Sequence, residues 1–415
     1  MDANILQVIE NTEENIKEQL NKISQIVTDN QDKVLNAFQI AKVGDYHFNP
    51  TTGYGYDDLG RDKLEEVYAS VFGAEDALVR PQIVSGTHAI TTALFGNLRP
   101  GDELVSITGR PYDTLEQVIG INKQVDGSLR DFGVNYNEIM LTQSGGIDYE
   151  QIEQEISSDT KMVMIQRSKG YANRPSFSIS DTEEMIQFVK NINENIIVFV
   201  DNCYGEFVER QEPTNVGADL IAGSLIKNPG AGIVKTGGYL VGRKDLIERS
   251  ANYLVAPGLG KETGASLYSL QEMFQGLFLA PHIVGEALKG AIYTSKLLNE
   301  NGYETTPSSY DHRTDLIQSV TFNTKEEMVK FAQVIQKQSP INSHVTPHPD
   351  YMPGYDHDVI MAAGTFIQGA SLELTADGPI RPPYTLYVQG GLTYEHVKLA
   401  ITKALIMLQN LKSGV

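Results

Sequence analysis

The sequence contains a short apolar run that ends abruptly in a carboxylate, Ile196-Ile-Val-Phe-Val-Asp201. A wholly apolar run of this length is typical of a parallel strand that is covered on both faces. In open α/β sheets the carboxyl ends of the strands face the ligand crevice, so we expect Asp201 to lie at a binding site. A carboxylate in that place can pair with a protonated ring nitrogen of a ligand. An ordinary loop or helix-capping aspartate is the alternative interpretation of this run taken alone.

A second stretch follows another predicted strand and carries a lysine, Gly223-Ser-Leu-Ile-Lys227-Asn-Pro-Gly230. A lysine among apolar and glycine residues is poorly placed to be a solvated surface lysine. Partial burial is expected to lower the pKa of Lys227, which frees the amine to attack an aldehyde. Ser224 could reach a phosphate oxygen while this amine reaches an aldehyde at the other end of the same ligand. A lysine that snorkels out of a loop is the alternative.

A third segment, Ser85-Gly86-Thr87-His88, lies between a predicted strand and a predicted helix. Backbone N–H groups at the N-terminus of a helix bind phosphate, and glycine lets the backbone approach closely. Taken alone this motif is weak, because many such turns are only turns. In chain order with Asp201 and Lys227, it completes a set that suits pyridoxal 5'-phosphate (PLP): a phosphate site, a partner for the ring nitrogen and a lysine that holds the aldehyde.

Hydrophobic periodicity divides the chain into three predicted regions. Residues 1–60 are expected to form an N-terminal helical arm followed by a Gly/Tyr-rich loop. Residues 61–285 alternate strands with helices, which predicts a large PLP-binding α/β domain with a mostly parallel sheet. Residues 286–415 form a smaller α+β domain, with predicted strands over 316–322, 365–374 and 384–389.

The composition excludes several classes of partner. The chain has 33 basic and 53 acidic residues, for a net charge of −20, which disfavours nucleic acid and anionic membrane surfaces. Its apolar runs are too short to span a bilayer. A single cysteine, Cys203, forbids an intrachain disulfide framework and fits a reducing compartment, so we expect a cytoplasmic protein.

A cluster of histidines and aspartates in a proline-rich loop does not predict a metal site. Its spacing matches no regular pattern of metal ligands and it lies on no predicted helix. A polar surface or lid loop is the favoured interpretation of these residues: His344, His348, Asp350, Asp356, His357 and Asp358.

Two longer segments carry a family resemblance: Thr51-Thr-Gly-Tyr-Gly-Tyr-Asp-Asp-Leu-Gly-Arg61 and Val84-Ser-Gly-Thr-His-Ala-Ile90. With the order of the motifs, they are similar to the cystathionine and methionine lyase branch of fold-type I PLP enzymes. They resemble most closely the methionine γ-lyase-like bacterial family known as aluminium-resistance proteins or cystathionine β-lyases. The resemblance implies an aspartate-aminotransferase-like fold and a PLP-dependent carbon–sulfur lyase that acts on a sulfur-containing amino acid. It also implies a link to aluminium resistance and a homodimer or homotetramer with shared active sites.

The resemblance also implies roles for individual residues. Lys227 would hold the cofactor and act as the general base, while Asp201 would keep the ring nitrogen protonated. The tyrosine that stacks on the ring and assists proton transfer would be Tyr112. The cofactor phosphate would be held by Gly86, Thr87 and Ser224, and by two residues of a neighbouring subunit, Tyr56 and Arg61.

Substrate recognition is less closely specified by the resemblance. Arg381 is the nearest candidate to bind the substrate carboxylate, for which a guanidinium is well suited. Two candidates, Arg167 and Asn173, are open for the residue near the phenolic oxygen of the cofactor. Methionine lyases carry a cysteine where this chain has Thr114, so methionine need not be the substrate.

Other functions are compatible with the same motifs, because fold-type I enzymes share them. A γ-replacement synthase, an aldolase and an aminotransferase are alternatives within this fold. A non-catalytic PLP-binding stress protein is an alternative outside catalysis, although intact Lys227, Asp201 and Tyr112 argue against it. A nucleotide-binding α/β protein would require a Gly-x-Gly-x-x-Gly turn, which the segment at Ser85 does not provide.

Overall fold

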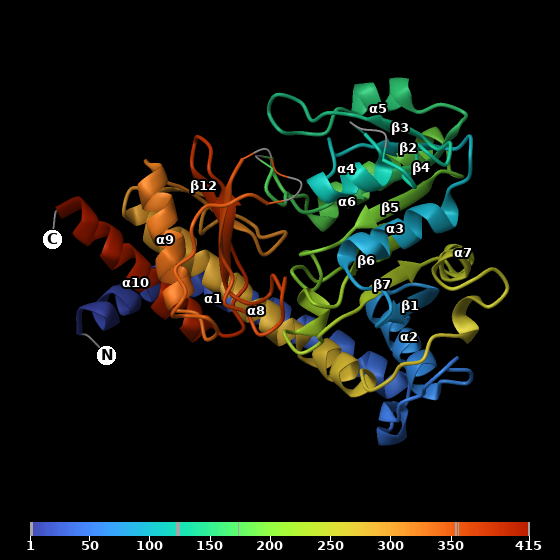
Figure 1. Cartoon of the computed structure of the whole chain (residues 1–415), viewed down its shortest axis with the longest axis horizontal. Helices are drawn as coiled ribbons and strands as arrows, with labels where there is room; N and C mark the ends of the chain where they lie inside the picture. The colour runs from blue at the N-terminus through green and yellow to red at the C-terminus, as the bar shows by residue number, and fades with distance from the viewer. Residues whose placement is uncertain (1–2, 122–124, 173, 353–354, 356, 414–415) are drawn as a thin grey trace. The chain divides into compact units, whose positions relative to one another are not determined.

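The computed structural model describes residues 3–121, 125–172, 174–352, 355 and 357–413 (Figure 1). The chain forms two compact units. One comprises residues 32–278, and the other comprises residues 1–31 together with 279–415. Two long helices, α1 (Ala3–Ile40) and α8 (Leu270–Glu300), contribute residues to both units.

A seven-stranded sheet forms the centre of the unit of residues 32–278, in the order β1-β7-β6-β5-β4-β2-β3. Four of its strand pairs are parallel, and β7 runs antiparallel to both of its neighbours. The strands are β1 (Asp76–Arg80), β2 (Glu103–Ser106), β3 (Asn135–Glu138), β4 (Thr160–Gln166), β5 (Ile197–Asp201), β6 (Leu220–Ser224) and β7 (Gly238–Gly242). All five residues of β5 are buried, as expected for an apolar strand covered on both faces.

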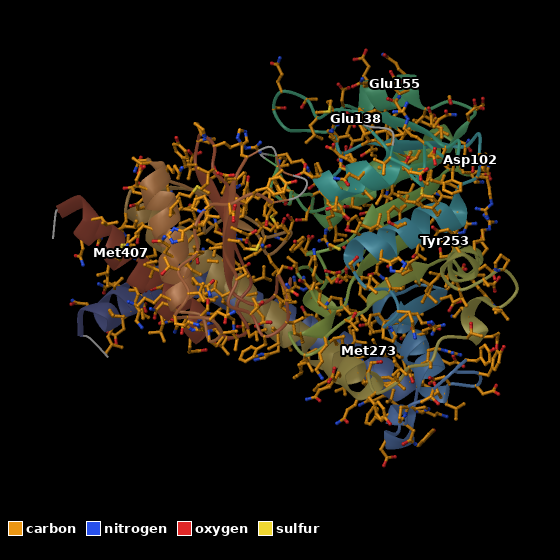
Figure 2. All side chains as sticks on the ribbon, viewed as in Figure 1. Asp102, Glu138, Glu155, Tyr253, Met273 and Met407 are labelled. Carbon is orange, nitrogen blue, oxygen red and sulfur yellow. The ribbon has the colours of Figure 1, made fainter. Side chains whose placement is uncertain are left out.

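Helices pack against this sheet and complete its core. They are α2 (Leu59–Phe72), α3 (Gly86–Asn97), α4 (Asp113–Ile119), α5 (Tyr149–Glu155), α6 (Ile179–Ile192) and α7 (Lys244–Leu254), with short 3₁₀ turns at Asp45–Phe48, Pro213–Val216, Asn228–Gly230 and Gly260–Glu262. Helix α3 lies against β6, β7 and α7. Tyr253 of α7, labelled in Figure 2, stacks its ring on Phe95 of α3 with 5.5 Å between the ring centroids. Helix α3 is thereby held by the sheet on one side and by α7 on another.

A five-stranded antiparallel sheet lies in the other unit, in the order β10-β11-β12-β9-β8. Its strands are β8 (Glu304–Thr306), β9 (Gln318–Thr321), β10 (Val359–Ala362), β11 (Thr375–Pro379) and β12 (Thr385–Gln389), and its helices are α9 (Lys325–Lys337) and α10 (Tyr394–Ser413). The predicted α/β class, with a large mostly parallel sheet and a smaller α+β part, is confirmed. No helix in the described part of the chain is both long and apolar enough to cross a membrane.

The predicted strand over residues 365–374 is wrong. This segment turns back on itself, with Gly369 at φ +79°, and the Glu373 carboxylate accepts the N–H groups of Phe366 and Ile367. The strand lies directly after it, as β11, whose sequence Thr-Ala-Asp-Gly-Pro has little intrinsic preference for a strand. Burial between β10 and β12 outweighs that weak preference.

Candidate active site

The carboxyl ends of β4, β5 and β6 bring polar side chains to one edge of the large sheet. Gln166 is the register partner of Asp201, and Asp201 is the partner of Ala222. Ser224 ends β6 and is 1% exposed. The last residues of three adjacent parallel strands therefore lie together at the edge where the sequence predicted a crevice.

The N-terminus of α3 approaches the same edge. A Cβ at Gly86 would lie 3.2 Å from Cys203 Sγ and 3.4 Å from Ser224 Cβ, so the glycine backbone lies directly against both. Ser85 caps the helix by accepting the His88 N–H at 3.0 Å. The first N–H groups of a helix have no acceptor within it, and here they belong to Gly86 and its neighbour. They provide an anion site beside the Ser224 hydroxyl.

Tyr112 joins this cluster through two hydrogen bonds. Its hydroxyl lies 2.9 Å from the Thr87 hydroxyl, and its backbone N–H donates to Gln166 Oε1 at 3.1 Å. Burial, and next the Asp201 carboxylate, raise the pKa of Tyr112 well above its ordinary value. The phenol therefore keeps its proton at neutral pH and can donate it.

Asp201 is a buried carboxylate whose charged form is favoured by two basic side chains, Lys227 and Arg174. It is 5% exposed, and the Cys203 N–H donates to its Oδ1 at 3.1 Å. Burial raises the pKa of Asp201, and the Lys227 ammonium opposes that shift. A positively charged partner is what such a carboxylate needs, since a buried charge is costly without one.

Lys227 begins the 3₁₀ turn after β6, and its Nζ lies 3.7 Å from the ring centroid of Tyr204. Burial alone would lower the pKa of Lys227, but Tyr204, Cys203 and Asp201 outweigh it, so the pKa is raised. The lowering of the Lys227 pKa expected from the sequence is thus wrong. The sequence showed the apolar neighbours of this lysine but not the polar groups of the turn after β5.

Two residues of the cluster were not predicted from the sequence. Gln166 positions Tyr112 by accepting its backbone N–H. The position of Gln166 at the end of β4 was the one feature of the sequence that could have indicated this role. Tyr204 lies against Lys227, and its left-handed backbone, with φ +72°, has no signature in the sequence.

Arg167 serves the fold of this edge. Its guanidinium is fully buried and donates to Asn202 Oδ1 and to the Gly205 carbonyl, each at 3.0 Å, and it pairs with Glu209. The side chain thereby holds the turn that follows Asp201. The other candidate for the phenolic-oxygen position, Asn173, lies outside the described residues.

Tyr56 and Arg61 lie in the loop before α2 and at its start. The recorded hydrogen bonds of the Arg61 guanidinium go to the Gly55 carbonyl at 2.7 Å, the Gly264 carbonyl at 3.3 Å and the Asp62 carboxylate at 3.0 Å. Tyr56 is 53% exposed and stacks on Tyr54. Among the described residues, none of these contacts is with the cluster around Lys227.

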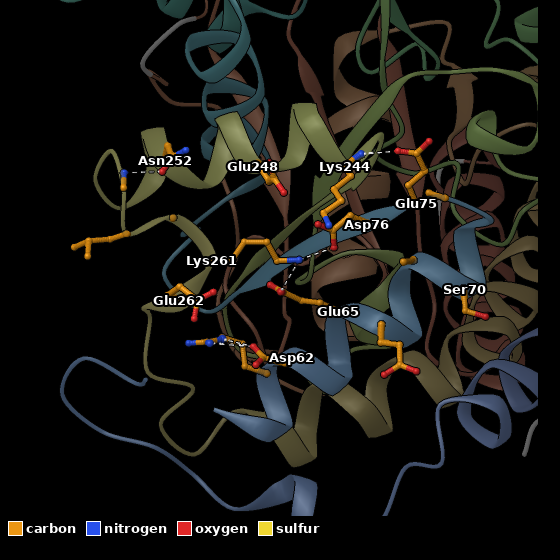
Figure 3. Close-up of a pocket in the computed structure, with 17 residues that line it drawn as sticks. Asp62, Glu65, Ser70, Glu75, Asp76, Lys244, Glu248, Asn252, Lys261 and Glu262 are labelled. Carbon is orange, nitrogen blue, oxygen red and sulfur yellow. Dashed lines mark hydrogen bonds and ion pairs between the residues drawn. The ribbon is translucent and has the colours of Figure 1, made fainter. Parts of the chain in front are cut away.

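Arg61 lines a cavity of about 880 Å³ that lies apart from this cluster (Figure 3). Its walls are mainly charged and come from α2, β1, α7 and the turn at Gly260–Glu262. In Figure 3 Lys261 reaches Glu65 at 3.2 Å and also pairs with Asp76. Acidic side chains outnumber basic ones in this lining, which makes the cavity poorly suited to an anionic cofactor, so we assign the chemistry to the edge at Lys227.

Arg381 belongs to the unit that contains the smaller sheet. It is exposed, lies just after β11, and its carbonyl accepts the Tyr384 N–H at 2.8 Å. Burial raises the pKa of Tyr387, and the nearby Arg381 guanidinium opposes this shift. Because Arg381 is exposed, its guanidinium can reach an anionic ligand.

The residues at the sheet edge fit PLP. The close approach of Gly86 to Ser224 leaves a cradle that a side chain at position 86 would fill. Helix N–H groups and a hydroxyl suit a phosphate, a buried carboxylate suits a protonated ring nitrogen, and a lysine amine suits an aldehyde.

The chain resembles known proteins along most of its length. The family model described as methionine gamma-lyase matches residues 5–409. YnbB of Bacillus subtilis (strain 168), an uncharacterized protein, is 63% identical over 384 residues, which cover 92% of this chain and 91% of YnbB. A solved structure from Listeria monocytogenes, provisionally named a cystathionine beta-lyase involved in aluminium resistance, is 61% identical with a TM-score of 0.96 and covers 97% of this chain and 100% of that one.

Two further structures bear on the activity and the fold. A carbon–sulfur lyase involved in aluminium resistance from Clostridium novyi NT is 49% identical, with a TM-score of 0.93, and covers 98% of this chain and 96% of that one. The PLP-dependent protein YhfS of Escherichia coli is 16% identical, with a TM-score of 0.63, over 93% of this chain and 97% of YhfS. At that identity the likeness to YhfS concerns the fold alone.

Proposed function

The chain belongs to the methionine gamma-lyase family, and we propose that it is a PLP-dependent carbon–sulfur lyase that acts on a sulfur-containing amino acid. The fold is that of fold-type I PLP-dependent enzymes, as the sequence predicted. One observation carries the proposal: helix α3 and the ends of β5 and β6 gather a phosphate cradle, a buried carboxylate and a lysine at one edge. The elimination would be of the cystathionine β-lyase or methionine γ-lyase type.

The cofactor phosphate would be held by the N–H groups of Gly86 and Thr87 and by the Ser224 hydroxyl. The positive end of the α3 dipole supports a dianion there. Asp201 would pair with the ring nitrogen, because a protonated nitrogen would stabilise the charge of this buried carboxylate. When bound, PLP supplies an electron sink for the bond that breaks at the substrate α-carbon.

Lys227 and Tyr112 would handle the protons. The Lys227 amine would hold the cofactor aldehyde, and as a free neutral amine it would accept the proton from the substrate α-carbon. Tyr112 keeps its phenolic proton and hydrogen-bonds Thr87 at the phosphate cradle. We assign it the donation of a proton to the leaving sulfur and the orientation of the cofactor ring.

The substrate carboxylate would be bound by Arg381, whose exposed guanidinium can donate two parallel hydrogen bonds to a carboxylate. Tyr56 and Arg61 would serve the phosphate of a neighbouring subunit. The contacts of Arg61 support the shape of the loop, and the exposed ring of Tyr56 is available to a partner. The working unit is therefore proposed to be a homodimer or homotetramer with shared sites.

We also propose a cytoplasmic location and a role in aluminium resistance. The single cysteine and the net charge of −20 support the first. The second rests on the names of the relatives from Listeria monocytogenes and Clostridium novyi. A strain that lacks the gene should then grow more poorly than its parent in medium containing aluminium.

The activity is tested with a panel of sulfur amino acids, including cystathionine, methionine and cysteine. We expect the sulfur product (a thiol from cystathionine or methionine, hydrogen sulfide from cysteine) and the 2-oxo acid in equal amounts, with pyruvate marking β-elimination and 2-oxobutyrate marking γ-elimination. The Lys227→Ala protein is the matched control and should release neither. Transfer of the amino group to a 2-oxo acid without release of thiol would instead identify an aminotransferase.

A further inference from the structure

The Lys227 amine rests on an aromatic face in this structure. Its Nζ lies 3.7 Å from the ring centroid of Tyr204, well within the range in which a cation is attracted by a ring face. Both side chains are only partly exposed, so water screens this attraction less than it would at the surface.

The backbone at Tyr204 holds the ring in place. Its φ of +72° lies in the left-handed region, which a bulky residue adopts only when its surroundings impose it. The turn is tied on one side by the Gly205 N–H, which donates to the Asn202 carbonyl at 2.9 Å. The Arg167 guanidinium also holds this turn, because it donates to Asn202 Oδ1 and to the Gly205 carbonyl.

The loop that carries Lys227 is attached to the same turn. Asn228 Nδ2 donates to the Glu206 carbonyl at 2.9 Å. This hydrogen bond joins the residue after the lysine to a residue just beyond Tyr204. The two backbone segments that carry the ring and the lysine are therefore held close to each other.

We propose that Tyr204 is a positioning residue for Lys227: its ring face holds the lysine side chain when the amine is not bound to the cofactor, and holds it most strongly once the amine has accepted a proton. This inference rests on the proposed role of Lys227. The ring face attracts the charged amine more strongly than the neutral one, so Tyr204 stabilises the protonated form of Lys227. The other titratable groups that face Lys227 are Asp201, Cys203, Glu206 and Tyr112.

The experiment follows the reactivity of Lys227 in the full-length protein freed of cofactor by a carbonyl reagent. Acetic anhydride labels neutral amines, and mass spectrometry of the Lys227 peptide gives the labelling rate at each pH. Exposed Lys235 serves as the internal reference. The midpoint of the curve reports protonation, while the plateau at high pH reports accessibility.

Tyr204→Leu removes the ring, and we expect the midpoint for Lys227 to fall by about one pH unit. Tyr204→Phe keeps the ring and should retain the native midpoint. Should the Leu protein fail to fold, Tyr204→Asn tests the same loss, because asparagine tolerates a left-handed backbone. In the holoenzyme, loss of the ring should lower kcat more than it changes KM.

Phe207→Leu is the matched control in the same turn. Phe207 also has a left-handed backbone, with φ +62°, and also lies under a lysine, Lys33, at 5.6 Å. Its loss should leave the midpoint of Lys227 unchanged. An unchanged midpoint in Tyr204→Leu, an equal fall in Phe207→Leu, or an equal fall in Tyr204→Phe would each overturn the proposal. None of these results depends on turnover, so failure here is distinct from failure of the lyase activity.

Discussion

At the residue scale, the proposed chemistry depends on buried groups that need particular partners. Asp201 is buried at the end of β5 and has a raised pKa, so it gains from a cationic ring nitrogen. Replacing it with alanine should still let Lys227 capture the cofactor but should lower kcat/KM by about a hundredfold or more, since losing one partner of a buried pair costs about 3–5 kcal/mol. Steady-state kinetics and the yellow colour of the protein measure the two effects. Near-native turnover in Asp201→Ala would show that another residue pairs with the ring.

Glu206 predicts a pH dependence of stability. It is fully buried, it accepts the Tyr239 hydroxyl at 2.7 Å, and burial raises its pKa from 4.5 to about 8. Between these two values the unfolded chain releases a proton that the folded chain keeps, so the free energy of unfolding falls as the pH rises and levels off above about pH 8.

The Glu206→Gln protein lacks this titration. Between about pH 4.5 and pH 8 its free energy of unfolding should therefore rise relative to that of the parent protein, by at most a few kcal/mol. Thermal melting of both proteins from pH 5 upward measures the difference. Melting curves that stay parallel at every pH would mean that Glu206 is ionised in the folded state.

At the element scale, the seating of α3 decides where the phosphate cradle lies. A Cβ at Gly96 would lie 2.7 Å from Ser250 Cα, so α3 and α7 touch backbone to backbone there. Gly96→Ala should lower the free energy of unfolding by about 1–3 kcal/mol and weaken the binding of PLP, because the helix must shift. Denaturant unfolding and PLP titration are the measurements.

Gly146→Ala is the control for this change. Position 146 is exposed, and a Cβ there would meet only Thr142 Oγ1, at 3.4 Å, and Ser144 Oγ, at 3.9 Å. Its effect should stay within about 1 kcal/mol. Equal free energies of unfolding for the Gly96→Ala and Gly146→Ala proteins would show that α3 and α7 can move apart without loss of stability.

The sequence predicted the elements whose pattern is strong. The apolar runs of β4 and β5 and the turn before α3 each carry a local signal, and they led directly to Asp201 and Gly86. Strand β11 carries none, because its burial between two neighbours and not its composition makes it a strand. Contacts such as Tyr112 with Gln166, or Lys227 with Tyr204, join residues whose proximity depends on the folded turns.

At the scale of the whole molecule, the proposal of shared sites makes Tyr56 a residue that acts in trans. A Tyr56→Ala protein and a Lys227→Ala protein should each be impaired alone. Co-assembled, they should recover part of the native activity, because some mixed dimers contain one site with both residues intact. If mixed oligomers form but are never more active than either parent protein, Tyr56 acts in the active site of its own subunit or has no role there.

The central claim is that Lys227 holds PLP, and the most direct test is chemical. The purified protein should be yellow, and borohydride should fix the cofactor to a single lysine. Peptide mapping after reduction should find the pyridoxyl group in the peptide that contains Ser224-Leu-Ile-Lys227. A pyridoxyl group on a different lysine, or a colourless protein that PLP cannot tint, would contradict the account.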